Sequence, residues 1–233
     1  MKQLSLRLAL LSSLVPENSR VVDVGTDHGY LAIHLAQSKA LRSVIATDLR
    51  PGPLSSAHKN VEQAQLEDKI SLRLCDGLAA VAPEEADVIV IAGMGGETIL
   101  NILSAAPWAL QDRLLLLGPQ SKQPELRAWL YAHGCAIREE RLVEEEGKIY
   151  PILAVEGRAA AMPEAVELYI GAWPLEKRDA LFYTYLSTHI ARLEREKAGL
   201  EKSKNEGSAK RVAELDELLN ALRKMEKERE TDE

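Results

Sequence analysis

The stretch that most constrains the fold of this chain is residues 21–36, which read VVDVGTDHGYLAIHLA. A short apolar run is followed by an acid, two glycines and then apolar residues at helical spacing. This order predicts a β-strand that enters a tight turn and continues into a helix of a parallel α/β sheet. Asp23 falls at the strand end, where open α/β folds bind ligands. We therefore expect a nucleotide-type pocket, with Gly25 and Gly29 letting backbone approach the ligand.

The acids of this turn indicate what the pocket binds. A dinucleotide-binding turn carries G-x-G-x-x-G, whose N–H groups hold a pyrophosphate. Here Asp23 replaces the first glycine and Asp27 adds a second carboxylate, so a pyrophosphate would be repelled. Two carboxylates suit a cationic ligand, and S-adenosylmethionine carries an ammonium and a sulfonium. The motif is short, and at this point a plain strand–turn–helix is an equal alternative.

Two further predicted strands end close to an acid. Residues 43–47 lead into Asp48, and Ile70–Leu74 is followed by Asp76 and Gly77. The carboxyl ends of parallel strands meet at one edge of a sheet, so these acids are expected to converge with the first one. We expect Asp48 to accept hydrogen bonds from ribose hydroxyls and Asp76 to face an adenine amino group. A helix N-cap or loop role is the alternative for Asp48.

A second glycine-rich turn follows the predicted fourth strand, residues 87–92. After Asp87 the strand is a continuous run of β-branched residues and one alanine, as a buried central strand requires. It runs directly into Gly93-Met94-Gly95-Gly96-Glu97. Such glycine density predicts that backbone closely approaches a ligand or a flat base at the strand end. A tight strand-to-helix turn alone is the alternative.

The remaining pattern completes one α/β domain and adds a helical one. Two predicted strands, residues 136–143 and 149–155, close the first part as an antiparallel pair, which is typical of the seven-stranded methyltransferase sheet. We therefore expect a Rossmann-like domain over residues 1–158. Residues 159–233 begin with an alanine-rich linker, carry no strand pattern and keep a heptad-like spacing that breaks at residues 205–208. This spacing predicts a helical domain with an antiparallel coiled-coil hairpin.

The composition limits the classes of function. A net charge of -7 and a pI near 5.4 argue against a generally basic nucleic-acid binder, although a local basic face is compatible with them. Cys75 and Cys135 form no C-x-x-C pair, so we expect no Cys-based zinc site. Arg7 interrupts the leucine-rich N-terminal run, which argues against a signal peptide. No apolar stretch is long enough to span a bilayer. We expect a soluble cytoplasmic monomer without a metal.

Several of these segments resemble one known family. The motifs VGTDHG at residues 24–29, AGMGGE at residues 92–97 and LSLRL at residues 4–8, together with the C-terminal hairpin, resemble the bacterial tRNA (adenine(22)-N(1))-methyltransferase family, TrmK. The resemblance covers essentially the whole chain. It implies a class I S-adenosylmethionine-dependent enzyme that methylates N1 of adenine 22 in the D-arm of tRNA, with the hairpin helping to hold the tRNA.

The candidate site residues follow from these motifs. Candidates for a catalytic role are Asp27, Gly93 and Met94. Candidates for binding S-adenosylmethionine are Asp23, Gly25, Asp27, His28, Gly29, Asp48, Leu49, Asp76, Gly77, Ala92 and Gly93. Candidates for contacting tRNA are Arg7, Arg50, Lys122, Arg127, Lys202, Lys204, Lys210 and Arg211.

The turn after the fourth strand bears on which atom is methylated. Enzymes that methylate an exocyclic base amine usually carry an Asn/Asp-Pro-Pro-aromatic turn there, whereas this chain has Ala-Gly-Met-Gly-Gly. N1 of adenine has its own lone pair and needs no general base, so positioning and stabilisation of the ring cation suffice. Asp27 is a candidate for that stabilisation, and cofactor binding or turn formation are equal alternatives. The base must be extruded from the tRNA, and Met94 and its neighbouring glycines are the candidates for its platform.

Two other functions fit the same fold. One is a small-molecule methyltransferase whose hairpin serves for dimerisation, and the other is a non-catalytic regulator that binds the cofactor. A salt-dependent affinity for tRNA separates the RNA enzyme from the first. Methyl transfer to any acceptor excludes the second.

Overall fold

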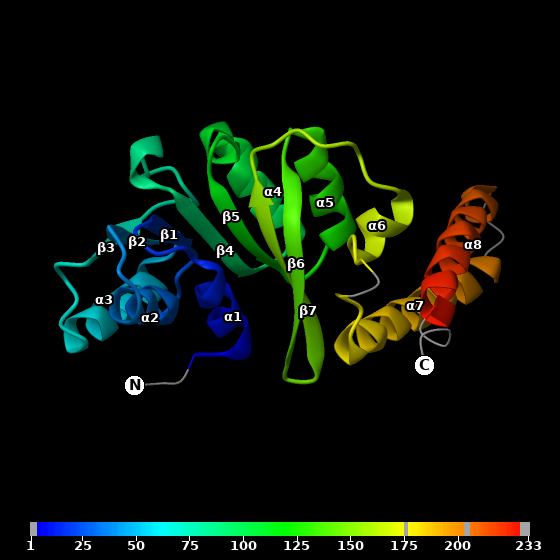
Figure 1. Ribbon diagram of the computed structural model, residues 1–233, viewed down its shortest axis with the longest axis horizontal. Helices are drawn as coiled ribbons and strands as arrows, with labels where there is room; N and C mark the ends of the chain where they lie inside the picture. Colours follow the sequence, from blue (N-terminus) through cyan, green and yellow to red (C-terminus); the bar gives the residue numbers. More distant parts are fainter. Residues whose placement is uncertain (1–3, 175–176, 203–205, 229–233) are drawn as a thin grey trace. The chain divides into compact units, whose positions relative to one another are not determined.

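The computed structural model describes residues 4–174, 177–202 and 206–228 (Figure 1). The chain divides into two compact units, Met1–Met162 and Pro163–Glu233. The division falls inside the segment 159–163, which the sequence predicts as a linker. None of the described helices is both long and apolar enough to cross a membrane.

Among the described residues, the first unit is built on a seven-stranded sheet with the order β3-β2-β1-β4-β5-β7-β6 (Figure 1). Its strands are β1 Arg20–Val24, β2 Ser43–Asp48, β3 Ile70–Leu74, β4 Val88–Met94, β5 Leu114–Pro119, β6 Ala136–Glu145 and β7 Lys148–Glu156. Strands β1 to β5 pair in parallel, and β7 runs antiparallel to both β5 and β6. This confirms the predicted Rossmann-like methyltransferase sheet. The strand order reverses between β1 and β4, where open sheets bind ligands.

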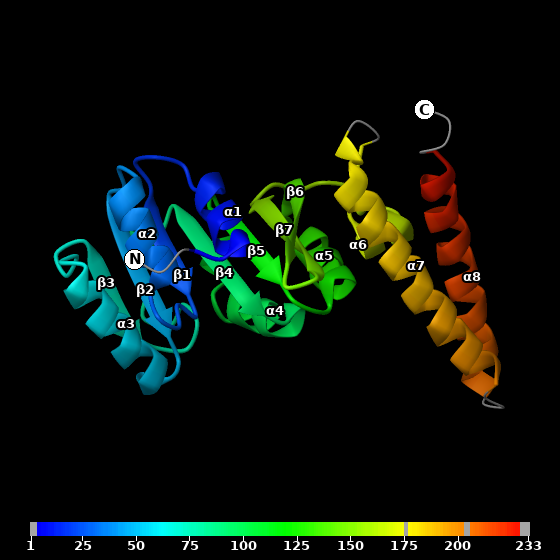
Figure 2. The same ribbon diagram turned by 90° about the horizontal axis from the view of Figure 1, so that it is seen from below.

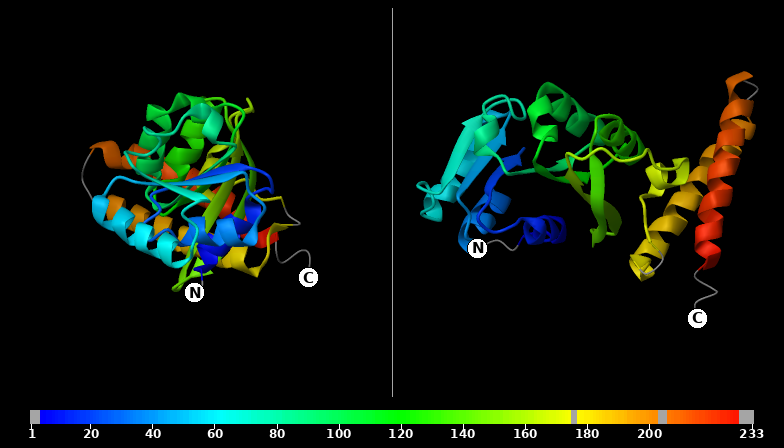
Figure 3. Two further views of the ribbon diagram at one scale, coloured as in Figure 1. Left: turned by 90° about the vertical axis from the view of Figure 1, so that its left-hand side faces the viewer. Right: turned by 45° about the horizontal axis from the view of Figure 1, so that its top comes forward.

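Helices cover both faces of this sheet (Figure 2, and Figure 3, left). They are α1 Leu6–Leu14, α2 Tyr30–Ser38, α3 Pro51–Gln63, α4 Gly96–Ala105 and α5 Gln123–Ala132. The alternation along β4 explains the two layers: Val88 and Val90 pack with residues of α1 and α2, whereas Ile89 and Ile91 pack with residues of α4 and α5. Because both faces are buried, the strand is apolar at every position, as predicted.

Strand β4 is longer than predicted. It continues past residue 92 to Met94, and a bulge between Ala92 and Met94 leaves Gly93 outside the pairing with β5. Gly93 has a φ of +76°, a conformation that glycine adopts without steric cost. Bulges of this kind commonly lie next to active sites, where they redirect the backbone.

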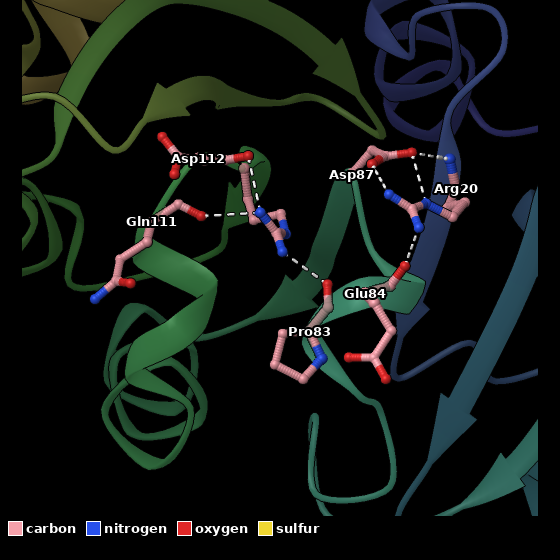
Figure 4. Close-up of polar contacts among 7 residues, drawn as sticks. Arg20, Pro83, Glu84, Asp87, Gln111 and Asp112 are labelled. Carbon is pink, nitrogen blue, oxygen red and sulfur yellow. Dashed lines mark hydrogen bonds and ion pairs between the residues drawn. The ribbon is translucent and has the colours of Figure 1, made fainter.

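An ion pair between Arg20 and Asp87 holds the amino-terminal edge of the sheet (Figure 4). The glycine-rich turns follow the carboxyl ends of the strands, at the opposite edge. Arg20 at the start of β1 donates from Nη2 and Nε to Asp87, at 2.6 Å and 3.0 Å, and also donates to the carbonyl of Glu84. The guanidinium lowers the pKa of Asp87 to about 2. Strands β1 and β4, which flank the reversal of strand order, are thereby joined at this edge.

The second unit contains α6 Ala165–Ile170, α7 Ala180–Glu201 and α8 Glu206–Lys227. Helices α7 and α8 lie side by side as an antiparallel hairpin, as predicted (Figure 2). Their buried residues recur every three or four positions: Phe182, Tyr185, Leu186, Ile190, Leu193, Leu215, Leu219 and Leu222. Lys197 occupies one position of this seam and pairs with Asp216 of α8.

Two details of the second unit correct the prediction. Helix α6 was not predicted, because its six residues are too few for a periodic pattern to stand out. Helix α8 begins at Glu206, so residues 206–208 belong to it and not to the predicted break. Asn205, the first residue of that predicted break, lies outside the described residues.

Candidate active site

A cavity of about 1040 Å³ lies where the carboxyl ends of the central strands meet. It is lined by Asp23 at the end of β1, by Asp48 at the end of β2, by Asp76 after β3 and by Gly93 near the end of β4. The three acids, which lie at or just after the carboxyl ends of three successive strands, therefore face one space. This arrangement follows from the parallel topology, which brings the carboxyl ends of these strands to one edge.

The turn between β1 and α2 is fastened to the end of β2. The backbone N–H groups of Gly25 and Thr26 donate to the carbonyl of Thr47, at 2.8 Å and 3.0 Å. The N–H of Asp27 donates to Asp48 Oδ2 at 3.2 Å. Asp27 has a φ of +53°, which aspartate tolerates better than most residues. The turn is thus held in one conformation before any ligand binds.

Asp23 is a buried carboxyl group in an acidic surrounding. Its side chain accepts a 2.6 Å hydrogen bond from the hydroxyl of Thr26. Burial raises the pKa of Asp23 to about 6, and the nearby charge of Asp48 adds to that effect. Among the ion pairs between described residues, none involves Asp23. A cationic group in the cavity would supply the missing countercharge.

Asp48 organises two backbone segments at once. Its Oδ1 accepts from the N–H of Arg50 at 2.8 Å, and its Oδ2 accepts from the N–H of Asp27. The residue is only 6% exposed. A carboxylate offers about four acceptor positions, so two remain for hydroxyl donors in the cavity. Asp48 is therefore both a structural residue of the turn and a suitable acceptor for ribose.

The glycines of the first turn have different roles. A Cβ on Gly25 would overlap the Cε methyl of Met94, whose side chain crosses the turn. A Cβ on Gly29 would lie 3.2 Å from the Cβ of Ala57 in α3. Gly29 was predicted to admit a ligand. The structure instead assigns it to the close packing of the start of α2 against α3.

The glycines of the second turn also have different roles. A Cβ on Gly95 would lie 2.9 Å from Ser121 Oγ, and one on Gly96 would lie 2.6 Å from the carbonyl oxygen of Lys122. These two glycines therefore allow the β5–α5 turn to pack closely, and they do not face a ligand. Gly93 differs, because nothing lies within 4 Å of the position of its missing Cβ and the residue lines the cavity. Of these three glycines, only Gly93 is placed so that the backbone can closely approach a ligand in the cavity, as predicted for the whole turn.

The end of β3 forms another wall of the cavity. The carbonyl of Gly77 accepts from Thr47 Oγ1 at 3.0 Å, which ties this segment to β2. Asp76 is exposed beside it, and Leu49, in the loop between β2 and α3, is 63% exposed although it is a large apolar residue. An exposed leucine on a cavity wall offers apolar surface to a flat ring.

Two aromatic rings beside Asp27 were not recognised together from the sequence. His28 and Tyr30 are stacked, with ring centroids 5.4 Å apart and an interplanar angle of 28°. His28 Nε2 lies 3.6 Å from Asp27 Oδ2, and the two side chains are 45% and 64% exposed. All three residues line the cavity. In the sequence Tyr30 is simply the first residue of the helix after the turn, and no local pattern indicates that its ring stacks on His28.

Three of the predicted tRNA contacts lie in the first unit with exposed or half-buried side chains. Arg50 is exposed and lines the cavity. Lys122 is exposed and pairs with Glu125 at 3.0 Å. Arg7 already has two protein partners. Its Nε lies 2.5 Å from Glu145 Oε2 in an ion pair, and its guanidinium lies 4.5 Å from the centre of the Tyr150 ring.

The prediction that Arg127 contacts tRNA is corrected by its burial. Its side chain is 1% exposed and donates to both carboxylate oxygens of Glu140, at 3.0 Å and 2.8 Å. A guanidinium so enclosed between α5 and β6 cannot reach a phosphate on the surface. Arg127 lies on the inner side of α5, and its sequence position alone did not reveal this.

The predicted tRNA contacts of the hairpin differ in their surroundings. Lys202 and Lys210 are exposed. Arg211 is committed to acids, because it pairs with Glu196 at 2.9 Å and Glu214 at 3.2 Å. Lys204 lies outside the described residues.

Comparison with known sequences supports one interpretation of this site. Residues 4–153 match the family model of a methyltransferase domain. The tRNA (adenine(22)-N(1))-methyltransferase of Bacillus subtilis strain 168 is 34% identical over 186 residues, which are 77% of this chain and 78% of that protein.

Solved structures agree with this comparison over nearly the whole chain. Streptococcus pneumoniae Sp1610 in complex with S-adenosyl-L-methionine has a TM-score of 0.84 and 34% identity, and the match covers 96% of this chain and 100% of that one. M. capricolum TrmK in complex with S-adenosyl-homocysteine has a TM-score of 0.81 and 27% identity, and the match covers 96% of this chain and 97% of that one.

Proposed function

As a member of the tRNA (adenine(22)-N(1))-methyltransferase family, this chain is an S-adenosylmethionine-dependent enzyme, and we propose that it methylates N1 of adenine 22 in tRNA. The observation that carries this proposal is the pair of buried carboxyl groups, Asp23 and Asp48, at the strand ends of one cavity. In the part of the chain that the structure describes, neither carboxyl group takes part in an ion pair, and such a pair suits a cationic cofactor. We infer that the protein acts in the bacterial cytoplasm, where its proposed tRNA substrate occurs.

The cavity residues divide by the part of the cofactor that they suit. Asp23 would face a cationic group, and Asp48 would accept from the ribose hydroxyls. Leu49 and Asp76 would border the adenine ring, one with apolar surface and the other with an acceptor for the amino group. Gly93 would permit close approach of the backbone to the cofactor, whereas at Gly25 the same approach would require the end of the Met94 side chain to move.

The chemistry requires little from the protein beyond placement. When bound, S-adenosylmethionine supplies a methyl group that passes from its sulfonium sulfur to N1 of adenine, and the positive charge passes to the ring. N1 attacks with its own lone pair, so no residue has to remove a proton. The protein contributes by holding the acceptor in line and by stabilising the cationic ring.

Asp27 is the residue that we assign to stabilising this cation. Its carboxylate lies at the rim of the cavity and is 64% exposed. An exposed charge acts weakly through water, and its effect grows when a bound macromolecule excludes that water. Asp27 therefore acts on the ring only when tRNA covers the rim, and not on the free cofactor.

A direct test uses unmodified tRNA and labelled S-adenosylmethionine. Nucleoside analysis should detect 1-methyladenosine in the product. A tRNA in which guanine replaces adenine 22 is the matched control and should accept no label. Label in a different nucleoside, or equal label in both tRNAs, would exclude the proposed position. Methylation of small molecules alone would favour a small-molecule enzyme.

The hairpin is the second proposed contact with tRNA. We assign Lys202 and Lys210, the exposed lysines near the turn of the hairpin, to phosphate binding. The double variant Lys202→Glu and Lys210→Glu should weaken tRNA binding and flatten its dependence on salt. The matched control is the same change at Lys224 and Lys227, which lie in the last turn of α8. An equal effect of both pairs would indicate only a general dependence on net charge.

A further inference from the structure

The stacked rings of His28 and Tyr30 have no function in the cofactor site described above. They follow Asp27 directly, they line the same cavity, and they are neither fully buried nor fully exposed. The imidazole side chain retains 45% of its exposure although one side meets the Tyr30 ring. A flat, partly exposed aromatic surface therefore borders the carboxylate that we assign to the reacting base.

The backbone under this pair is fixed from two sides. Asn60 of α3 donates from Nδ2 to the carbonyl of His28 at 2.8 Å. Asp48 accepts from the N–H of Asp27, the preceding residue. The rings also order one another by stacking. Little conformational entropy then remains to be lost when a third ring is added.

An extruded adenine needs such a surface. A base leaving the tRNA loses its stacking partners, and proteins commonly replace them with aromatic side chains. The sequence offered Met94 as the platform, but its side chain lies across Gly25 and against the core between the sheet and α4. Trp108 also lines the cavity, but it packs against the same core.

We propose that the His28–Tyr30 stack is the platform on which the target adenine rests beside Asp27. The proposal rests on the assignment of an extruded adenine as the methyl acceptor. Stacking positions the ring, and the aromatic faces favour the cation that forms on it. His28 was predicted as a cofactor contact, whereas here its ring is assigned to stacking with the target base.

The test measures cofactor affinity and methyl transfer separately in three variants. His28→Ala removes the outer ring, His28→Phe keeps an aromatic surface without the ring nitrogens, and Tyr30→Ala removes the support. Base–aromatic stacking is worth on the order of 1–3 kcal/mol, so His28→Ala should lower kcat/KM for tRNA by roughly 5- to 150-fold. His28→Phe should restore most of this loss. Affinity for S-adenosylmethionine, measured by calorimetry, should change less than about twofold.

His133→Ala is the matched control, because it removes a histidine that also stacks on an aromatic ring. The ring centroids of His133, which directly follows α5, and Trp129 are 4.1 Å apart, and His133 is not among the residues that line the cavity. This control should methylate tRNA at the wild-type rate. Its activity verifies that losing a stacked imidazole is not harmful in general.

The outcomes separate the stack from the proposed function. If wild-type protein methylates no adenine 22, the proposed function has failed and the stack has no acceptor. If wild-type protein is active but His28→Ala is unimpaired, or His28→Phe is as impaired as His28→Ala, stacking is not the role. If cofactor affinity falls in step with the rate, the rings bind the cofactor and the proposal is overturned.

Discussion

Replacing Asp23 by asparagine should stabilise the protein while impairing the cofactor site. Burial raises the pKa of Asp23 from its ordinary 3.8 to about 6, and the difference of about two pH units is equivalent to about 3 kcal/mol. The folded state therefore holds this proton to a higher pH than the unfolded state does. The free energy of unfolding falls as pH rises from about 4 to about 6 and is lowered by the full amount above that range.

Asparagine removes the charge and keeps an oxygen that can accept from Thr26. At pH 7.5, without cofactor, Asp23→Asn should raise the free energy of unfolding by up to about 3 kcal/mol. The gain should shrink as the pH falls through about 6 and should vanish only below about pH 3, where the wild-type carboxyl is protonated in both the folded and the unfolded state. Urea unfolding followed by circular dichroism at several pH values measures this difference.

Asp68→Asn makes the same chemical change at an exposed aspartate and serves as the control. It should change the free energy of unfolding by less than about 0.5 kcal/mol. A gain for Asp23→Asn that is the same at pH 4.5 and pH 7.5 would refute the electrostatic explanation. A loss of stability at pH 7.5 would show that the charged form is well solvated in the folded protein.

Three further variants test other parts of the molecule. Asp48→Ala should weaken S-adenosylmethionine binding by on the order of 1–3 kcal/mol in calorimetry, and unchanged affinity would exclude the ribose contact. Asp27→Asn should lower turnover by an amount equivalent to about 2–4 kcal/mol with little change in either affinity, because its effect arises in the transition state. Arg127→Ala should lower the free energy of unfolding by about 3–5 kcal/mol in a urea titration, because it leaves Glu140 buried without its ion-pair partner. Arg138→Ala is the control: it breaks an exposed ion pair and should lower the free energy of unfolding by under about 1 kcal/mol.

The sheet was predictable because its pattern is local and repeated. Each strand is a short apolar run, and the residues at its carboxyl end follow directly in the sequence. Parallel topology then brings Asp23, Asp48 and Asp76 to one cavity without further information. The hairpin was predictable for the same reason, because a seam of leucines repeats along both helices.

What the sequence did not reveal depends on contacts between distant segments. Three glycines looked equivalent in the second turn, yet Gly95 and Gly96 serve packing against the residues before α5, and only Gly93 faces the cavity. Arg127 looked like a surface cation until β6 placed Glu140 against it. No local pattern records either contact.

The cofactor itself can show which of its cations meets Asp23. If this carboxylate is the countercharge, affinity should fall as the pH drops through about 6, at most tenfold per pH unit, because protonation removes the attraction. S-adenosylhomocysteine keeps the ammonium and lacks the sulfonium, so titrating both molecules by calorimetry between pH 5 and pH 7.5 separates the two partners. Equal pH dependence indicates that Asp23 meets the ammonium, whereas dependence for S-adenosylmethionine alone indicates the sulfonium. If neither affinity changes, Asp23 does not act as a countercharge, and its burial has to be explained by the turn.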